Sequence, residues 1–201
     1  MDIKKELDAV VARFDLLKHP FYEAWSAGTL PVQALATYAE EYGAFVQAVP
    51  AGWAAHGDVR TASEEVTHAV LWEGFANALG TSSLGGPRLA ETKSLVEACA
   101  RQFSDPVTSL GGLYAFEAQQ PKTSTSKLQG LREHYSSLPE DVEPYFAVHC
   151  DDVQEMGWII ERLEGKSDED KQRAVAACED VAKGLWDALT GIHDQHMARA
   201  N

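Results

Sequence analysis

Acidic and histidine side chains recur on apolar faces of the chain, and side chains of these types are common ligands of transition metals. The first group lies in the segment EEVTH, where either Glu64 or Glu65 precedes His68 by about one helical turn. The spacing Glu-x-x-His is the one that di-iron helical bundles use. The same spacing is common on solvated helices, but here Trp72 and Phe75 continue the face. This apolar continuation favours an internal metal site.

A second acidic side chain, Glu117, lies on an apolar stripe that includes Leu110, Leu113 and Tyr114. Burying a carboxylate costs free energy unless the group is protonated, paired or bound to a cation. A hydrogen bond to Tyr114 or an ion pair with Lys127 would satisfy Glu117 without a metal. We therefore expect Glu117 to be either a metal ligand or one member of such a pair.

The third group lies in the segment YFAVHCDDVQE at residues 145–155. His149 falls on the core-facing side of the predicted helix, and Asp152 and Glu155 follow at intervals of three residues. Two histidines with these carboxylates would form a mixed nitrogen and oxygen ligand set. Such a set suits iron or manganese, and open coordination positions would let iron bind dioxygen. A single core histidine is more often only hydrogen-bonded, and this alternative stays open for His149.

Aromatic side chains at helical spacing accompany these groups. Tyr22, Tyr38 and Tyr42 are more typical of a core than of a cofactor site, although a tyrosine near a metal can donate an electron or a proton. The side chains that we predict to line a substrate pocket are Tyr42, Trp72, Phe75 and Phe116.

The helices that must position these groups follow from apolar residues spaced three and four apart. We predict eight helical stretches and no strand, with Pro50 kinking the third stretch and Gly80 ending the fourth. The stretches cover residues 2–17, 19–28, 31–57, 60–79, 88–103, 105–135, 140–164 and 167–198. The expected fold class is an all-α bundle of seven to eight helices, in a single domain that spans residues 1–201.

Composition limits the classes of partner and the compartment. The formal net charge of -14 disfavours nucleic acid as a partner, because phosphate binding requires clustered lysine and arginine. There is no run of about 18 apolar residues, so we expect no membrane span. The N-terminus is too acidic and amphipathic for a secretory signal. The three cysteines show no metal-finger spacing and leave one unpaired in any disulfide scheme, which favours a reducing cytoplasm.

Five collinear segments together resemble the haem-oxygenase-like di-iron oxidases, and in particular the branch of the chlamydial death-domain-associating proteins and para-aminobenzoate synthases. The pyrroloquinoline-quinone synthases and TenA-type thiaminases share the wider fold. The segments are HPFYEAWSAGTL (19–30), ALATYAEEYGAFVQAVP (34–50), HAVLWEGFANALG (68–80), YAFEAQQPKTSTSKLQGLREHY (114–135) and YFAVH (145–149). The resemblance implies a haem-free bundle with a di-iron centre inside it. Members use dioxygen to oxidise or cleave small amine, amino-acid or fatty-acid substrates.

The resemblance also implies roles for individual residues. The positions that match its metal ligands are His68, Glu117, His149 and Asp152. Tyr22 and Lys127 match a tyrosine and a lysine that the para-aminobenzoate synthases consume or use, so that Tyr22 would be the source of the product's ring.

The chain departs from the family pattern at two places. Thr61 stands where the family places its first glutamate, so that Glu64 or Glu65 must substitute for it. The last ligand segment is one residue shorter than the family's, and Glu155 stands in place of its final histidine. A carboxylate-rich di-iron site, a mono-iron site and a site that no longer binds metal are all compatible with these departures.

The function that we predict is a dioxygen-dependent non-haem iron oxidase acting on a small metabolite, with two iron ions or with manganese in place of iron. A homodimer is compatible with this prediction. One alternative is a metal-free enzyme on the same fold, with Cys150 beside His149 as its nucleophile. Another is a ligand-binding or interaction protein with a degenerate metal site.

Overall fold

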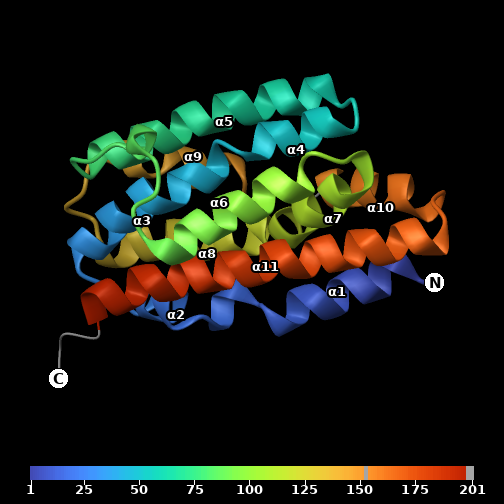
Figure 1. Cartoon of the computed structure of the whole chain (residues 1–201). Coiled ribbons are helices and arrows are strands. Elements are labelled where there is room, and N and C mark those ends of the chain that lie inside the picture. The colour runs from blue at the N-terminus through green and yellow to red at the C-terminus, as the bar shows by residue number, and fades with distance from the viewer. Residues whose placement is uncertain (152–153, 198–201) are drawn as a thin grey trace.

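The computed structural model describes residues 1–151 and 154–197, and all regular elements of this part of the chain are helical. Most of the helices run roughly along one long axis (Figure 1). The predicted all-α fold class is confirmed. The α-helices are α1 Ile3–Arg13, α2 Pro20–Ser26, α3 Val32–Val46, α4 Val49–Ala55, α5 Val59–Ala78, α6 Ala90–Gln102, α7 Pro106–Glu117, α8 Gln120–His134, α9 Pro144–Val148, α10 Gln154–Glu164 and α11 Asp168–Met197. Short 3-10 turns cover Leu16–Lys18, Ser83–Gly85 and Glu140–Val142.

Prolines divide two of the predicted stretches into separate helices. The stretch 31–57 becomes α3 and α4, and Pro50 lies in the first turn of α4. The stretch 105–135 becomes α7 and α8, and Pro121 lies in the first turn of α8. A proline lacks the N–H that a helix interior needs but is tolerated in a first turn, where that N–H has no partner within the helix. Each proline therefore marks the start of a new helix.

The prediction of one continuous helix over residues 140–164 is wrong. A 3-10 turn precedes α9, which ends at Val148, and α10 begins at Gln154. His149 closes α9 with φ −98° and ψ 2°, a conformation outside the helical region. His149 and Glu155 therefore belong to two different helices.

The helix α7 forms the centre of the bundle, because every residue from Leu110 to Glu117 is buried. It packs along α11, whose 30 residues correspond to a length of roughly 45 Å. On the other side of the bundle, α5 packs on α3 and α4, and α9 packs on α5 (Figure 1). One continuous apolar core joins these layers. Among the described helices, none is both long and apolar enough to cross a bilayer.

The close contact between α7 and α11 depends on Gly111. A Cβ atom at this position would lie 1.9 Å from the backbone oxygen of Ala174 on α11. Gly111→Ala should therefore push the two helices apart and lower the free energy of unfolding by about 3 kcal/mol. Gly74 on α5 is the matched control, because a Cβ there meets no atom within 4 Å. Gly74→Ala should raise the stability by ~0.5–1 kcal/mol through helix propensity.

Urea unfolding followed by circular dichroism measures both variants. If Gly111→Ala were as stable as the wild type, α7 and α11 would not be in the contact described here.

Candidate metal centre

Three side chains of types that commonly bind metal ions meet inside the bundle. Glu65 and His68 lie on α5, and His149 is the residue that closes α9. His68 Nδ1 lies 3.1 Å from Glu65 Oε1 and 3.1 Å from His149 Nε2. One ligand atom from each residue can be chosen so that all three lie within 4.8 Å of one another. Glu65 and His149 are buried and His68 is partly buried, so this Glu65–His68–His149 cluster is an internal set of one carboxylate and two imidazoles.

The local structure of α5 explains why Glu65 faces inward. The helix begins after Asp58, whose carboxylate accepts a hydrogen bond from the Thr61 N–H at 3.1 Å. Thr61, Glu65, Trp72 and Phe75 are buried, and their spacings of four, seven and three residues place them on one helix face. Trp72 and Phe75, in the C-terminal half of this face, pack against the core. Glu65 lies on the same face about two turns before Trp72 and is therefore also directed into the interior.

Glu64, which we predicted as a possible metal ligand, does not belong to the cluster. Its position on the surface of α5 corrects that prediction. Adjacent residues of a helix point about 100° apart, so Glu64 and Glu65 cannot both face the core. The Glu64 side chain is 47% exposed, and its Oε1 lies 2.9 Å from Arg60 Nη1 on the surface of α5. Its carboxylate is therefore satisfied by a surface ion pair.

The orientation of His149 is fixed by the turn that precedes it. Its Nδ1 lies 2.6 Å from the backbone oxygen of Tyr145. A carbonyl oxygen can only accept a hydrogen bond, so Nδ1 carries the proton. The lone pair of the neutral ring is then on Nε2, the atom that faces His68. A histidine that binds a metal through Nε2 requires this tautomer and commonly owes it to a hydrogen bond of this kind.

Glu117 is buried at the end of α7, and Trp53 Nε1 donates a hydrogen bond to its Oε1 at 3.3 Å. The partners that we considered from the sequence are engaged elsewhere. Tyr114 donates its hydroxyl to Asp8 at 2.6 Å, and Lys127 donates to the Tyr38 hydroxyl at 3.3 Å.

The charges of Glu117 and of Glu65 both influence Tyr145, the residue one helical turn before His149. Burial raises the pKa of the Tyr145 phenol well above its ordinary value, and the charges of Glu65 and Glu117 raise it further. Both carboxylates therefore act on the same phenol, although Glu117 is not in the group of three within 4.8 Å.

The remaining two predicted ligands belong to the segment in which the helix prediction was wrong. Asp152 lies outside the described residues. Glu155 is buried in the first turn of α10 and is not part of the three-residue group.

Tyr22 and Lys127 lie together in a second buried cluster. The Tyr22 and Tyr38 hydroxyl oxygens are 2.9 Å apart, and Lys127 Nζ lies 5.2 Å from the centre of the Tyr22 ring and 4.9 Å from that of Phe146. Burial among these rings lowers the pKa of Lys127 from 10.5 to about 7. Near neutral pH a large fraction of this amine is therefore uncharged, which a surface lysine would not be.

The low pKa of Lys127 predicts that the stability of the fold depends on pH. The unfolded chain keeps the proton up to about pH 10.5, whereas the folded chain releases it near pH 7. Between these values the unfolded chain binds more protons at this position, so stability rises with pH, and the burial cost is largest below pH 7. Lys127→Met should remove this cost and stabilise the protein by roughly 1–4 kcal/mol at about pH 6, with a smaller gain at about pH 9.5.

Urea unfolding at the two pH values measures this difference. Lys122→Met on the same helix is the control, because the Lys122 side chain is 49% exposed. A gain from Lys127→Met that is the same at both pH values, or no larger than that from Lys122→Met, would contradict the burial cost.

The four residues predicted to line a substrate pocket are all buried. Trp72 contacts Tyr42 and Phe75, with ring centres 5.6 and 5.3 Å apart. Phe116 packs against Phe45 at 4.9 Å, and Phe45 contacts Tyr42 at 5.2 Å, so the four rings belong to one aromatic cluster. Sequence reasoning missed Tyr145 and Trp53, which contact the proposed ligands. The spacing of four residues between Tyr145 and His149 is the signal that could have indicated the first of them.

The structure does not pair Cys150 with His149 in the way that a thiol nucleophile and its base require. The Cys150 thiol donates to the backbone oxygen of Phe146 at 3.2 Å. The two ring nitrogens of His149 face Tyr145 and His68. This arrangement gives the metal-free alternative no support.

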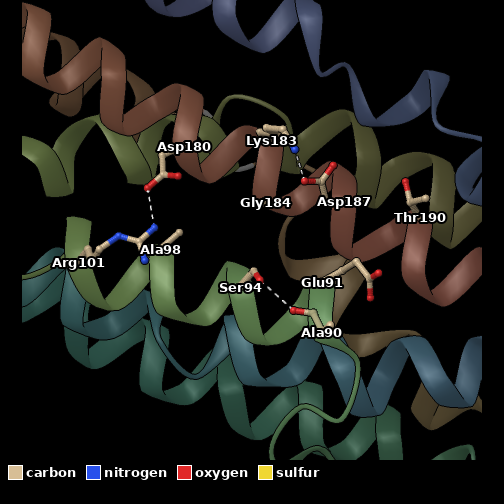
Figure 2. A pocket seen from close by; sticks show the side chains of 10 residues that line it. All are labelled: Ala90, Glu91, Ser94, Ala98, Arg101, Asp180, Lys183, Gly184, Asp187 and Thr190. Carbon is tan, nitrogen blue, oxygen red and sulfur yellow. Dashed lines mark hydrogen bonds and ion pairs between the residues drawn. The ribbon is translucent and has the colours of Figure 1, made fainter.

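A surface groove between α6 and α11 has a volume of about 390 Å³ (Figure 2). Four of its charged side chains form two ion pairs, and Glu91 lies beside them. Arg101 lies 3.2 Å from Asp180, and Lys183 is ion-paired with Asp187. The Ser94 hydroxyl donates a hydrogen bond to the backbone oxygen of Ala90 at 3.0 Å. Apart from Glu91, the charged side chains of the groove therefore satisfy one another.

The chain is similar in sequence to a family of redox enzymes and to 4-aminobenzoate synthases. A family described as iron-containing redox enzymes matches residues 33–184. A 4-aminobenzoate synthase from Nitrosomonas europaea is 30% identical over 228 aligned positions, which cover 97% of this chain and 92% of that protein.

Solved structures share the fold at low sequence identity. A domain from Shewanella denitrificans with a haem-oxygenase-like fold has a TM-score of 0.76 and 20% identity, covering 97% of this chain and 93% of that one. A TenA homologue from P. horikoshii has a TM-score of 0.75 and 12% identity, covering 96% and 98%. The predicted haem-oxygenase-like fold is confirmed.

Proposed function

The chain belongs to the iron-containing redox enzymes, and on that premise we propose that it is a non-haem iron oxidase that uses dioxygen to form 4-aminobenzoate. The observation that carries the proposal is the Glu65–His68–His149 cluster. Iron held there would supply the redox chemistry, with dioxygen as co-substrate.

The donor atoms of the cluster fit an ion of this kind. Ligand atoms about 2.1 Å from a common ion and at right angles to one another lie about 3 Å apart. The two separations that involve His68 Nδ1 are each 3.1 Å, and the third is no longer than 4.8 Å. One carboxylate and two imidazoles are also the ligand types of non-haem iron sites with open positions.

The other predicted ligands would extend the site. In this proposal Glu117, Asp152 and Glu155 would hold a second ion, and the indole N–H of Trp53 donates a hydrogen bond to Glu117. Manganese in place of one iron is compatible with the same oxygen-rich set.

Tyr22 and Lys127 supply the reacting groups in this proposal. The 4-aminobenzoate ring would come from the Tyr22 phenol, as the family resemblance implies. Lys127 holds an amine beside that ring, and its lowered pKa leaves much of the amine neutral near pH 7. A neutral amine has the lone pair that a nucleophile or a proton acceptor needs. The aromatic rings around both groups limit the access of water.

The proposal is tested by loading anaerobically purified protein with Fe(II), or with Fe(II) and Mn(II), and then adding dioxygen. Mass spectrometry should detect 4-aminobenzoate and a matching loss of intact Tyr22. The product should not exceed one molecule per chain, because the chain itself provides the ring. If metal-loaded protein yields neither change, and metal addition does not raise the melting temperature, the alternative of a degenerate site is favoured.

A further inference from the structure

The two groups that supply 4-aminobenzoate in the proposed function are enclosed by the bundle. Tyr22 and Lys127 are 2% and 3% exposed. The rings of Tyr38 and Phe146, which lie against them, are buried as well. A molecule formed between these side chains cannot diffuse into water until the structure opens.

Tyr22 and Lys127 belong to two different helices, α2 and α8, and face each other across their interface. Lys127 Nζ is 5.2 Å from the centre of the Tyr22 ring, and the Trp25 indole N–H on α2 donates to the Lys127 backbone oxygen at 3.2 Å. At the surface, the hydroxyl oxygens of Ser26 and Ser126 lie 3.0 Å apart in an exposed hydrogen bond. We call these five facing residues the α2–α8 seam.

The two ends of α2 are held differently. His19, the buried residue that precedes the helix, places its Nε2 3.0 Å from the Thr190 hydroxyl on α11. At the other end, the Ser26–Ser126 hydrogen bond and the 3.0 Å contact between His134 Nε2 and the Ser26 backbone oxygen are both exposed. Water can replace exposed hydrogen bonds at little cost in free energy. The C-terminal end of α2 is therefore the end that can move away from α8.

A surface groove of about 540 Å³ lies at the outer side of the seam. Ser26 of α2 and Ser126 and Gly130 of α8 line it, together with Cys150. Cavities of this size are typical of those that bind small molecules. Cys150 also acts electrostatically on Lys127, so one residue of the groove influences the buried amine.

The close fit of Trp25 keeps the seam shut in the intact protein. A Cβ atom at Gly130 would lie 2.7 Å from Trp25 Cδ1, so the indole packs directly on the backbone of α8. Opening must withdraw this indole from α8, which makes the open state a rare one rather than a permanent channel.

Consumption of Tyr22 removes a second restraint on α2. In the intact protein the Tyr22 hydroxyl lies 2.9 Å from the Tyr38 hydroxyl, and the two rings pack edge to face. A ring detached from α2 no longer holds that helix on α3, and the loss of buried contacts destabilises the packing around it. The seam should therefore open more often after the reaction than before it.

We propose that 4-aminobenzoate leaves the protein through the α2–α8 seam, which opens when the C-terminal end of α2 moves away from α8 while His19 stays on α11. The inference rests on the proposed function, in which the product forms between Tyr22 and Lys127. The groove beside Ser26 and Ser126 is the first space outside the seam that the product enters.

The test closes the seam with a removable cross-link. The double variant Ser26→Cys/Ser126→Cys places two thiols where the hydroxyl oxygens are 3.0 Å apart, so that a disulfide can join α2 to α8. Cys150→Ser is added to every protein compared, because Cys150 lines the same groove and would compete for the new thiols. Thiol titration verifies the disulfide. The same protein with its disulfide reduced is the matched control.

Product release is measured on Fe(II)-loaded full-length protein after dioxygen is added. Peptide mapping follows the consumption of Tyr22, and mass spectrometry of an ultrafiltrate follows free 4-aminobenzoate. We expect the locked and reduced forms to consume Tyr22 equally, but the locked form to release the product about tenfold more slowly or less. Reducing the disulfide afterwards should release the retained product.

Hydrogen exchange measures the opening itself, without iron or dioxygen. Backbone amides in α2 should exchange faster than those of the buried helix α7. The disulfide should slow exchange in α2 and leave exchange in α5, which has no residue in the seam, unchanged.

Equal rates of product release from the locked and reduced forms would overturn the proposed exit. If the disulfide prevents the consumption of Tyr22, hydrogen exchange decides: slower exchange confined to α2 supports the opening, and equal exchange in the two forms overturns it. Failure of the proposed function looks different, because the iron-loaded protein without the two new cysteines would then also leave Tyr22 intact.

Discussion

Glu65→Ala is expected to abolish functional iron binding. The variant removes the buried carboxylate of the cluster, whose Oε1 lies 3.1 Å from His68 Nδ1. Loss of a residue that merely supports a metal ligand typically weakens binding 10- to 100-fold, so loss of the ligand itself should cost about 100-fold or more. Production of 4-aminobenzoate should fall below detection in the same variant.

The neighbouring glutamate gives a matched control for this prediction. Glu64→Ala removes the same chemical group from the same helix, but from the exposed side where Arg60 pairs with it. Its stability should change by no more than about 0.5 kcal/mol, and its iron affinity should equal that of the wild type. Titration of both variants with Fe(II) under anaerobic conditions measures the difference. Equal iron affinity in the two variants would mean that Glu65 is not a ligand.

Tyr22→Phe is expected to eliminate 4-aminobenzoate while leaving iron binding intact. Phenylalanine keeps the ring but lacks the phenol oxygen, so it cannot lose a hydrogen atom as a phenol does. The variant also loses the 2.9 Å hydrogen bond to Tyr38, which should cost ~0.5–1.5 kcal/mol of stability.

A second buried tyrosine separates this chemical effect from the structural one. The Tyr135 hydroxyl donates to the Leu30 backbone oxygen at 3.0 Å, so Tyr135→Phe loses one buried hydrogen bond as well. Tyr135→Phe should show a similar loss of stability with normal product formation. Product from Tyr22→Phe at the level of Tyr135→Phe, measured by mass spectrometry, would exclude Tyr22 as the ring source.

Much of the bundle follows from hydrophobic spacing because each helix must bury one continuous face. All eight predicted stretches contain helix. The breaks at Pro50 and Pro121 also have a signal in the sequence, since a proline suits the first turn of a new helix better than an interior.

The end of α9 was not predictable from spacing alone. Apolar residues continue at helical intervals from Phe146 through Met156 to Leu163, which favours one long helix. The chain nevertheless leaves the helical conformation at His149. Asp151, in the segment that follows, is a residue type common at helix starts and is the available signal for a second helix.

The sequence alone could have shown that Glu65, and not Glu64, faces the core. Thr61, Glu65, His68, Trp72 and Phe75 are spaced by alternating intervals of four and three residues, which is the spacing of one helix face. Glu64 falls off this face. The meeting of His149 with this stripe could not be derived from periodicity, because it depends on how α9 packs against α5.

The central claim is that an iron ion is held by Glu65, His68 and His149. Crystals of Fe(II)-loaded protein, measured at X-ray energies above and below the iron absorption edge, test it most directly. We expect an anomalous peak within bonding distance of the Glu65 carboxylate and of both imidazoles. A fully loaded crystal with its iron elsewhere, or with no iron between these three side chains, would contradict the account.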